Sequence, residues 1–174
     1  MNYHIEEMIS EERVDARIGE LAEQLNQEYA GRKLHLVIIL KGSIFFACEL
    51  AKRITVPVTM DFMSVSSYGD GMVSAGNITV KKELDEDIEG KNVLIVEDIV
   101  DSGNTLFHLK KLLSARDPES LKVITLLDKP DRRTADIETD YCGFVIEDKF
   151  VVGYGLDYAQ KHRNLPYIGV VVEE

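Results

Sequence analysis

Hydrophobic residues follow two patterns along the chain: continuous apolar runs, and spacings of three or four residues. Continuous β-branched runs at 34–40 and 92–98 predict strands that are buried on both faces. Apolar residues at helical spacing between positions 9 and 25 predict a helix that starts at Ser10 and stops at Gly31. The same patterns predict helices over 44–54 and 105–115, strands over 58–67, 78–84, 121–129 and 143–148, and apolar tail segments over 150–158 and 167–173.

Strands that alternate with helices indicate an α/β fold with a mostly parallel central sheet flanked by helices. A length of 174 residues suits one core, so we expect residues 1–174 to form a single domain. The polar segment 67–77 contains three glycines and no periodicity, and we expect it to form a mobile loop at the tip of a hairpin. Loops of this length in compact domains are often functional lids.

Charge and composition exclude several classes of partner. The chain has 31 acidic and 20 basic residues, a net charge of −11, which argues against a nucleic-acid surface. No apolar run approaches a membrane span, and the N-terminus lacks the basic and apolar blocks of a signal peptide. Cys48 and Cys142 lie in apolar segments, and we expect buried free thiols. A cytoplasmic protein follows from these features.

The stretch VLIVEDIVDSGNTL at 93–106 leads from a predicted strand into a predicted helix. Gly103 allows a close backbone approach, and the helix start directs free N–H groups at the loop. Ser102, Asn104 and Thr105 add side-chain donors, so the loop predicts a cup for one phosphate. The lysine of a nucleotide-binding P-loop is absent. The alternative is that these residues only cap the helix.

Three carboxylates, Glu97, Asp98 and Asp101, lie in or beside this cup although phosphate is an anion. Carboxylates suit sugar hydroxyls, or a hard cation such as Mg²⁺ reached through its waters. The spacing therefore predicts a ligand with a phosphate at one end and a diol in the middle, which is a ribose 5-phosphate.

This stretch resembles the phosphoribosyl pyrophosphate motif of the type I phosphoribosyltransferases. The resemblance covers almost the whole chain and narrows to the hypoxanthine-guanine phosphoribosyltransferases. It implies their fold, with a small hood formed by the N- and C-terminal segments and a flexible active-site loop. It also implies that the 5-phosphate binds at residues 101–105 and that Glu97 and Asp98 contact the ribose hydroxyls.

The resemblance extends to a pyrophosphate site. The stretch LKGS at 40–43 is similar to the family's pyrophosphate loop, which implies roles for Lys41 and Gly42 and a cis peptide between Leu40 and Lys41. The Ser67–Tyr68 pair is similar to the flexible loop that closes over the reaction centre. By the same resemblance Arg163 contacts pyrophosphate, where its fork of donors suits paired oxygens.

The resemblance also implies a purine site. Lys129 in LLDKP donates to the purine 6-oxo group, which selects 6-oxopurines over adenine. In DKFVVGYGLDY, Phe150 stacks on the purine and the backbone of Val151 reads its edge. Asp157 borders the purine and is a ligand for Mg²⁺, together with Glu97 and Asp98. A core phenylalanine, a turn aspartate and surface basic residues are the alternatives.

The implied reaction is Mg²⁺-dependent transfer of 5-phosphoribosyl from phosphoribosyl pyrophosphate to N9 of hypoxanthine or guanine, giving IMP or GMP. Asp101 is the candidate general acid/base because it faces N7 of the purine in the family. The family commonly forms dimers and tetramers, so we expect a homodimer or homotetramer. The preference between hypoxanthine and guanine stays open.

Three other readings stay open for the same motifs. The first is an enzyme of the class that takes xanthine, because contacts to the purine 2-position are largely backbone. The second is a regulator that senses phosphoribosyl pyrophosphate, although 174 residues leave no room for a repressor's DNA-binding domain, and the charge argues against RNA. The third is a structural protein with a relic fold, which has no need of Asp101, Lys129, Phe150 and Asp157 together.

Overall fold

The computed structural model describes residues 2–67 and 78–174. The strands of its central sheet are β2 (Leu34–Ile39), β3 (Val58–Ser67), β4 (Ile78–Lys82), β5 (Asn92–Val100), β6 (Ser120–Asp128) and β7 (Tyr141–Val145). Their order is β4-β3-β2-β5-β6-β7, and only the β3–β4 pair is antiparallel. The prediction of a mostly parallel sheet is confirmed, as is the return of 78–84 as a hairpin partner of β3.

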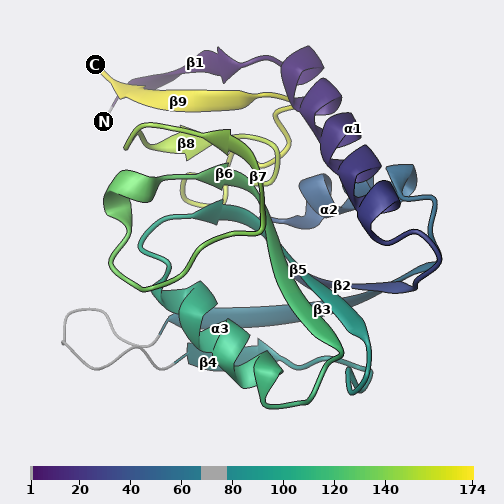
Figure 1. Cartoon of the computed structure of the whole chain (residues 1–174). Helices are drawn as coiled ribbons and strands as arrows, with labels where there is room; N and C mark the ends of the chain where they lie inside the picture. The colour runs from purple at the N-terminus through teal and green to yellow at the C-terminus, as the bar shows by residue number, and fades with distance from the viewer. Residues whose placement is uncertain (1, 68–77) are drawn as a thin grey trace.

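Helices cover both faces of this sheet (Figure 1). They are α1 (Glu11–Glu28), α2 (Ile44–Arg53) and α3 (Asn104–Ser114), with a 3-10 turn η1 (Pro130–Arg132) after β6. Ser10 caps α1, and its hydroxyl accepts the Arg13 N–H at 3.3 Å, as the sequence predicts. The α1 and α2 helices lie on one face, whereas α3 lies on the other.

Strand β2 shows why a continuous apolar run forms a two-sided strand. All six of its residues are buried, and successive side chains point to opposite faces. Leu36 and Ile38 join the core beneath α1 and α2, whereas Val37 and Ile39 join the core beneath α3. Strand β5 divides its apolar residues in the same way, so the two cores share one sheet.

A second, smaller sheet forms the predicted hood. It contains β1 (Tyr3–Ile9), β9 (Ile168–Glu173) and β8 (Val151–Val152), in the order β1-β9-β8, with antiparallel pairing. Strand β1 was not predicted as a strand, because exposed Glu6 and Glu7 interrupt its alternation. The assignment of Ile9 to the face of the first helix is wrong: Ile9 ends β1 and is buried there.

Other predictions need smaller corrections. The predicted apolar segment 150–158 contains the short strand β8, which is followed by turns at Gly153 and Gly155, both with positive φ. Cys48 is exposed on α2 and Cys142 is half-buried, so the expected burial is wrong for Cys48, while both are free thiols as expected. Within the described residues, no helix has the length and apolar character needed to span a membrane. Of the predicted loop 67–77, all but Ser67 lies outside the described residues.

We predict that Leu94→Ala lowers the free energy of unfolding by about 2–5 kcal/mol, because Leu94 is fully buried in β5 beneath α1 and α2. Urea denaturation measures this change. Val145→Ala is the matched control, since Val145 is 68% exposed, and its effect should stay within about 0.5 kcal/mol. Equal losses in the two variants would contradict the assigned core.

Candidate active site

The predicted phosphate cup lines a cavity at the carboxyl end of β5. The cavity has a volume of about 260 Å³, and its polar lining comes from Glu97, Asp101, Ser102, Gly103 and Thr105. Apolar residues of β2, β3, β5 and α3 complete the wall. Open parallel sheets bind ligands at this edge, so the cup and the fold agree in position.

The local structure of the cup depends on Gly103. This residue caps α3 with φ +80°, and a Cβ there would lie 2.6 Å from Ile137 Cγ2, so only glycine fits. The Asn104 N–H donates to Ser102 Oγ at 3.3 Å, and the next N–H groups of the first helical turn face the loop. Asn104 itself is exposed and accepts from the Thr134 hydroxyl at 3.5 Å. The arrangement suits a small anion at a helix start.

The two consecutive acids near the end of β5, Glu97 and Asp98, have no ion-pair partner among the described residues. Neither Glu97 nor Asp98 forms an ion pair with any residue that the structure describes. Burial, followed by the charge of Asp98, raises the pKa of Glu97 well above its usual value. Burial also raises the pKa of Asp98 to about 6, although the Ile99 N–H and the Arg163 charge act in the opposite direction. Both carboxylates therefore gain from hydroxyl donors or a hard cation.

The predicted pyrophosphate loop packs directly against Asp98. The Leu40–Lys41 peptide is cis, as expected. A Cβ on Gly42 would lie 1.7 Å from Asp98 Oδ2, and a Cβ on Gly155 would lie 1.9 Å from the Gly42 carbonyl oxygen. The two glycines therefore allow three segments to meet around one carboxylate.

Lys41 and Arg163, the two cationic residues expected to bind pyrophosphate, both contact Gln160, which was not predicted as a site residue. The Gln160 side-chain oxygen accepts from Lys41 Nζ at 3.4 Å and from Arg163 Nη2 at 3.3 Å. Arg163 also pairs with Asp157 Oδ1 at 3.0 Å and donates to the Gly155 carbonyl at 2.7 Å. The fold thus brings Lys41, Arg163 and Asp157 together from distant parts of the chain. Ser67 ends β3, and Tyr68 lies outside the described residues.

Lys129 lies beside Asp101 at the rim of the cup. Its side chain is buried, and its ammonium lies 3.6 Å from Asp101 Oδ1 and 3.8 Å from Asp148 Oδ1. Its backbone N–H donates to the Val100 carbonyl at 2.9 Å, which ties the end of β6 to the end of β5. A buried ammonium with two carboxylates and spare donors suits a carbonyl acceptor.

The predicted stacking residue presents an aromatic surface. Phe150 is 55% exposed, and its ring meets Tyr158 edge-on with centroids 5.5 Å apart. The next residue, Val151, is buried in β8 and pairs with Val170 of β9. Phe150 is therefore no core residue, and an exposed aromatic ring is suited to stacking on a planar ligand.

The acidic residues of the site suit a Mg²⁺ ion only if water and substrate phosphates supply its other ligands. No group of three His, Cys, Asp or Glu side chains in the described residues lies close enough to hold a metal ion. Asp157 already accepts from Arg163 and from the Gln160 N–H at 2.7 Å. Mg²⁺ commonly keeps several waters and takes other ligands from substrate phosphates. The residues present fit an ion bound in that way.

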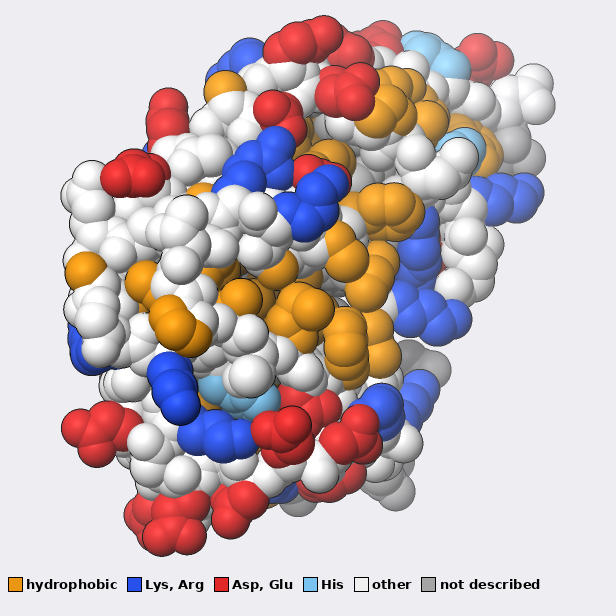
Figure 2. Space-filling view, turned by 90° about the vertical axis from the view of Figure 1, so that its right-hand side faces the viewer, with side chains coloured by type: hydrophobic (Ala, Val, Ile, Leu, Met, Phe, Trp, Pro, Cys, Tyr) orange, Lys and Arg blue, Asp and Glu red, His pale blue; other side chains and the backbone are white. Residues whose placement is uncertain are grey.

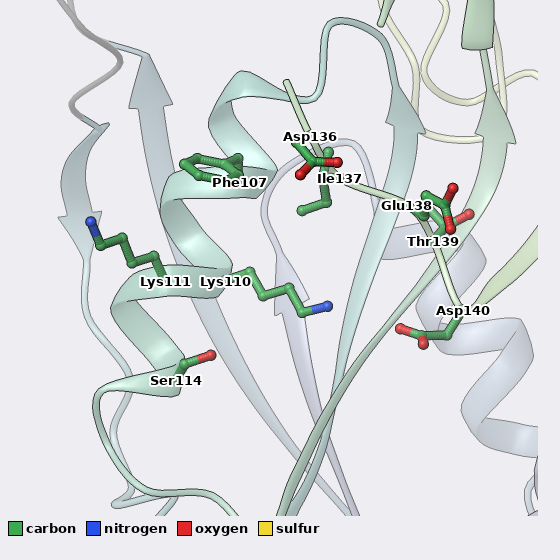
Figure 3. A pocket seen from close by; sticks show the side chains of 9 residues that line it. All are labelled: Phe107, Lys110, Lys111, Ser114, Asp136, Ile137, Glu138, Thr139 and Asp140. Atoms are coloured by element: carbon green, nitrogen blue, oxygen red, sulfur yellow. The ribbon is translucent and has the colours of Figure 1, made fainter. Parts of the chain in front are cut away.

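Two cavities of about twice the volume of the cavity at the phosphate cup lie away from this chemistry. One of about 550 Å³ lies between α3 and residues 136–140, where Lys110 points toward the acidic segment (Figure 3). Another of about 590 Å³ lies at the amino ends of β2, β3 and β5. Neither combines a helix start with unpaired buried acids, so we assign function to the smaller cavity at the carboxyl edge.

Sequence reasoning missed two polar residues at this site, Asp148 and Gln160. Each is an exposed residue in a loop, with no periodicity or spacing that distinguishes it. Their importance comes from the partners that folding brings to them, Lys129 for Asp148 and the Lys41–Arg163 pair for Gln160. No local sequence pattern predicts contacts of this kind.

Comparison with known proteins agrees with this geometry. A family model described as phosphoribosyl transferase domain matches residues 5–159. The hypoxanthine phosphoribosyltransferase of Salmonella typhimurium is 50% identical over 174 residues, which are 99% of this chain and 98% of the relative. That of Escherichia coli is 49% identical with the same coverage. A crystal structure of a Bacillus anthracis hypoxanthine-guanine phosphoribosyltransferase matches with TM-score 0.93 and 44% identity, over 99% of this chain and 100% of that chain.

We predict that Asp98→Asn raises the melting temperature of the ligand-free protein above pH 6 and has no effect below pH 3.8. Because the folded-state pKa is raised, the fold favours the protonated form and loses stability as pH rises through that pKa. Asparagine keeps the oxygen that accepts the Ile99 N–H.

Thermal denaturation over a pH series measures this effect. Asp136→Asn, at an exposed carboxylate, is the matched control. A gain that is the same at every pH would show that the Asp98 charge is not its cause.

Proposed function

This chain belongs to the phosphoribosyl transferase domain family, and from that premise we propose that it transfers 5-phosphoribosyl from phosphoribosyl pyrophosphate to N9 of hypoxanthine or guanine. The products are IMP or GMP and pyrophosphate, so the enzyme serves purine salvage. The observation that carries the proposal is the meeting of Lys129 and Asp101 at 3.6 Å, on the rim of the phosphate cup.

The ribose 5-phosphate half of the substrate fits the cup and the acids beside it. The 5-phosphate accepts hydrogen bonds from the first-turn N–H groups of α3 and from Ser102 and Thr105. Glu97 and Asp98 accept from the ribose hydroxyls, which replaces the hydration that burial removed. The sugar is then held with C1 facing the purine, and positioning of this kind lowers the barrier to transfer.

The leaving pyrophosphate fits the pair of cations at the hood. Lys41 and Arg163 replace their shared contact to Gln160 with contacts to phosphate oxygens. Glu97, Asp98 and Asp157 are the side chains that would hold Mg²⁺ in the substrate complex, with substrate phosphates and waters as further ligands. When bound, Mg²⁺ neutralises part of the charge that develops on the leaving group. Ser67 and Tyr68 are proposed to cover the pyrophosphate, which excludes water as a competing nucleophile.

The purine lies between Phe150 and the Lys129–Asp101 pair. Phe150 stacks on the ring, the Val151 backbone reads its edge, and Lys129 donates to the 6-oxo group. Asp101 faces N7, where its carboxylate takes or shares the proton and leaves N9 more nucleophilic. Adenine offers a 6-amino donor in place of the 6-oxo acceptor, so it cannot accept a hydrogen bond from the Lys129 ammonium.

We further propose that residues 1–174 act as a single domain in a cytoplasmic homodimer or homotetramer. Two free cysteines agree with a reducing compartment. Hydrophobic side chains gather on the face that carries α1 and α2 (Figure 2). Phe45 on α2 and Met60 on β3 are 42% and 50% exposed, which favours burial against another copy.

The proposal predicts which bases react. With Mg²⁺ and phosphoribosyl pyrophosphate, we expect nucleotide from hypoxanthine and guanine and none from adenine, because Lys129 requires an acceptor at the 6-position. A spectrophotometric assay of each base, with xanthine included, measures this selectivity. Binding of phosphoribosyl pyrophosphate without any product would instead identify a sensor.

Asp101→Asn is expected to lower kcat by about 10²–10⁴-fold, the range typical of lost general acid/base assistance. The KM for phosphoribosyl pyrophosphate should change little, because Ser102, Thr105 and the first-turn N–H groups of α3 remain. Steady-state kinetics with saturating hypoxanthine measure both constants. Asp131→Asn, an exposed carboxylate on η1, is the control, and an unchanged kcat in Asp101→Asn would remove Asp101 from the mechanism.

A further inference from the structure

Arg133, which follows η1, connects three segments behind the phosphate cup. Its Nε donates to the Asp101 carbonyl at 3.3 Å, and its Nη1 donates to the Ile137 carbonyl at 2.8 Å. Its Nη2 forms an ion pair with Asp128, the last residue of β6. The Arg133 and Asp128 side chains are only 18% and 13% exposed, so water screens this pair weakly. One side chain thus joins the cup, the end of β6 and the segment that returns to β7.

The backbone after Arg133 supports the same side of the cup. The N–H groups of Thr134 and Ala135 both donate to the Ser102 carbonyl, at 3.0 and 3.1 Å. Arg133 Cδ lies 2.9 Å from the position that a Cβ on Gly103 would take, so the side chain packs against the glycine. The carbonyl groups of the cup are therefore fixed by hydrogen bonds from residues 133–135, while its N–H groups face the cavity.

A guanidinium is the side chain that can make these contacts together. Its donors are fixed in one plane and point in different directions, whereas a lysine ammonium is a single point on a flexible stem. Removing Arg133 would leave the largely buried Asp128 carboxylate without its ion-pair partner and would free the Asp101 and Ile137 carbonyl groups. The peptide groups of residues 101–103 would then lose one of the supports that fix their orientation.

We propose that Arg133 is a positioning residue, which orients the loop 101–105 for phosphate binding and sets Asp101 against the purine. This inference rests on the proposed function for its catalytic consequence. In the proposed function Arg133 contacts neither substrate, and it acts by orienting the loop 101–105. A misplacement of about 1 Å can cost about 10²-fold in rate, so we expect a loss of that order in kcat/KM for phosphoribosyl pyrophosphate.

The matched control is Arg116, at the opposite end of α3 from the cup. Its guanidinium makes a two-pronged pair with Glu83, at 2.8 and 3.0 Å, and its side chain is 30% exposed. Arg116→Ala removes a comparable ion pair without any contact to the loop. It reports the effect of lost stability alone.

The experiment compares Arg133→Ala, Arg133→Lys and Arg116→Ala with the wild-type chain. Hydrogen–deuterium exchange of residues 101–105 in the ligand-free protein reports the loop directly and does not depend on activity. Calorimetric affinity for phosphoribosyl pyrophosphate and steady-state kcat/KM report the consequence. Added guanidinium ion should restore part of the affinity in Arg133→Ala. Arg133→Lys, which keeps a charge beside Asp128, provides the test if the alanine variant does not fold.

We expect faster exchange in 101–105 and weaker phosphoribosyl pyrophosphate binding in both Arg133 variants, with neither change in Arg116→Ala. Unchanged exchange, or exchange that rises equally in Arg116→Ala, would overturn the positioning role. Faster exchange of residues 101–105 with unaltered phosphoribosyl pyrophosphate affinity and kcat/KM would also overturn the positioning role. A wild-type chain that binds phosphoribosyl pyrophosphate but forms no nucleotide would refute the proposed function, while exchange and affinity still decide the role of Arg133.

Discussion

The constraint on which this structure depends is a pair of consecutive carboxylates, buried Glu97 and half-buried Asp98, that form no ion pair with any described residue. Glu97 and Asp98 lie near the carboxyl end of β5, and burial raises the pKa of both. Such charges lower stability until a ligand supplies donors or a cation. Natural proteins retain such destabilising groups where function requires them. Here the two apolar cores that share β2 and β5 offset the loss of stability.

The surroundings of these acids follow from that constraint. Cations could neutralise them directly, but Lys41 and Arg163 are held near them by Gln160 and Asp157 instead. In the proposed function, the same acids accept sugar hydroxyls while the cations remain for pyrophosphate. With a net charge of −11, the chain places two cations, Lys41 and Arg163, at the point where the proposed pyrophosphate leaves.

Rigid support from outside is the second requirement of the site. The phosphate cup consists of backbone groups, and backbone dipoles act on a ligand only when their orientation is held in advance. The segment 133–137 provides this support through hydrogen bonds to the carbonyls of Asp101 and Ser102 and through contact with Gly103. The hood, in turn, brings Phe150 and Asp157 to the same edge of the sheet. The site is therefore a product of three separate parts of the chain.

The sequence by itself determined the order of the helices and of the central-sheet strands, the mostly parallel sheet and the loop with its acids that predicts a phosphate cup. These features are encoded locally, as apolar periodicity or as one contiguous motif from Val93 to Leu106. Only the tertiary structure decided that β1 joins the hood, that Gly42 and Gly155 pack around Asp98, and that Gln160 and Arg133 support the site. The Lys41–Gln160 contact joins residues 119 positions apart, and the Arg133–Asp101 contact joins residues 32 apart. Contacts over such separations depend on the whole chain closing around its two cores, so no local pattern of residues predicts them.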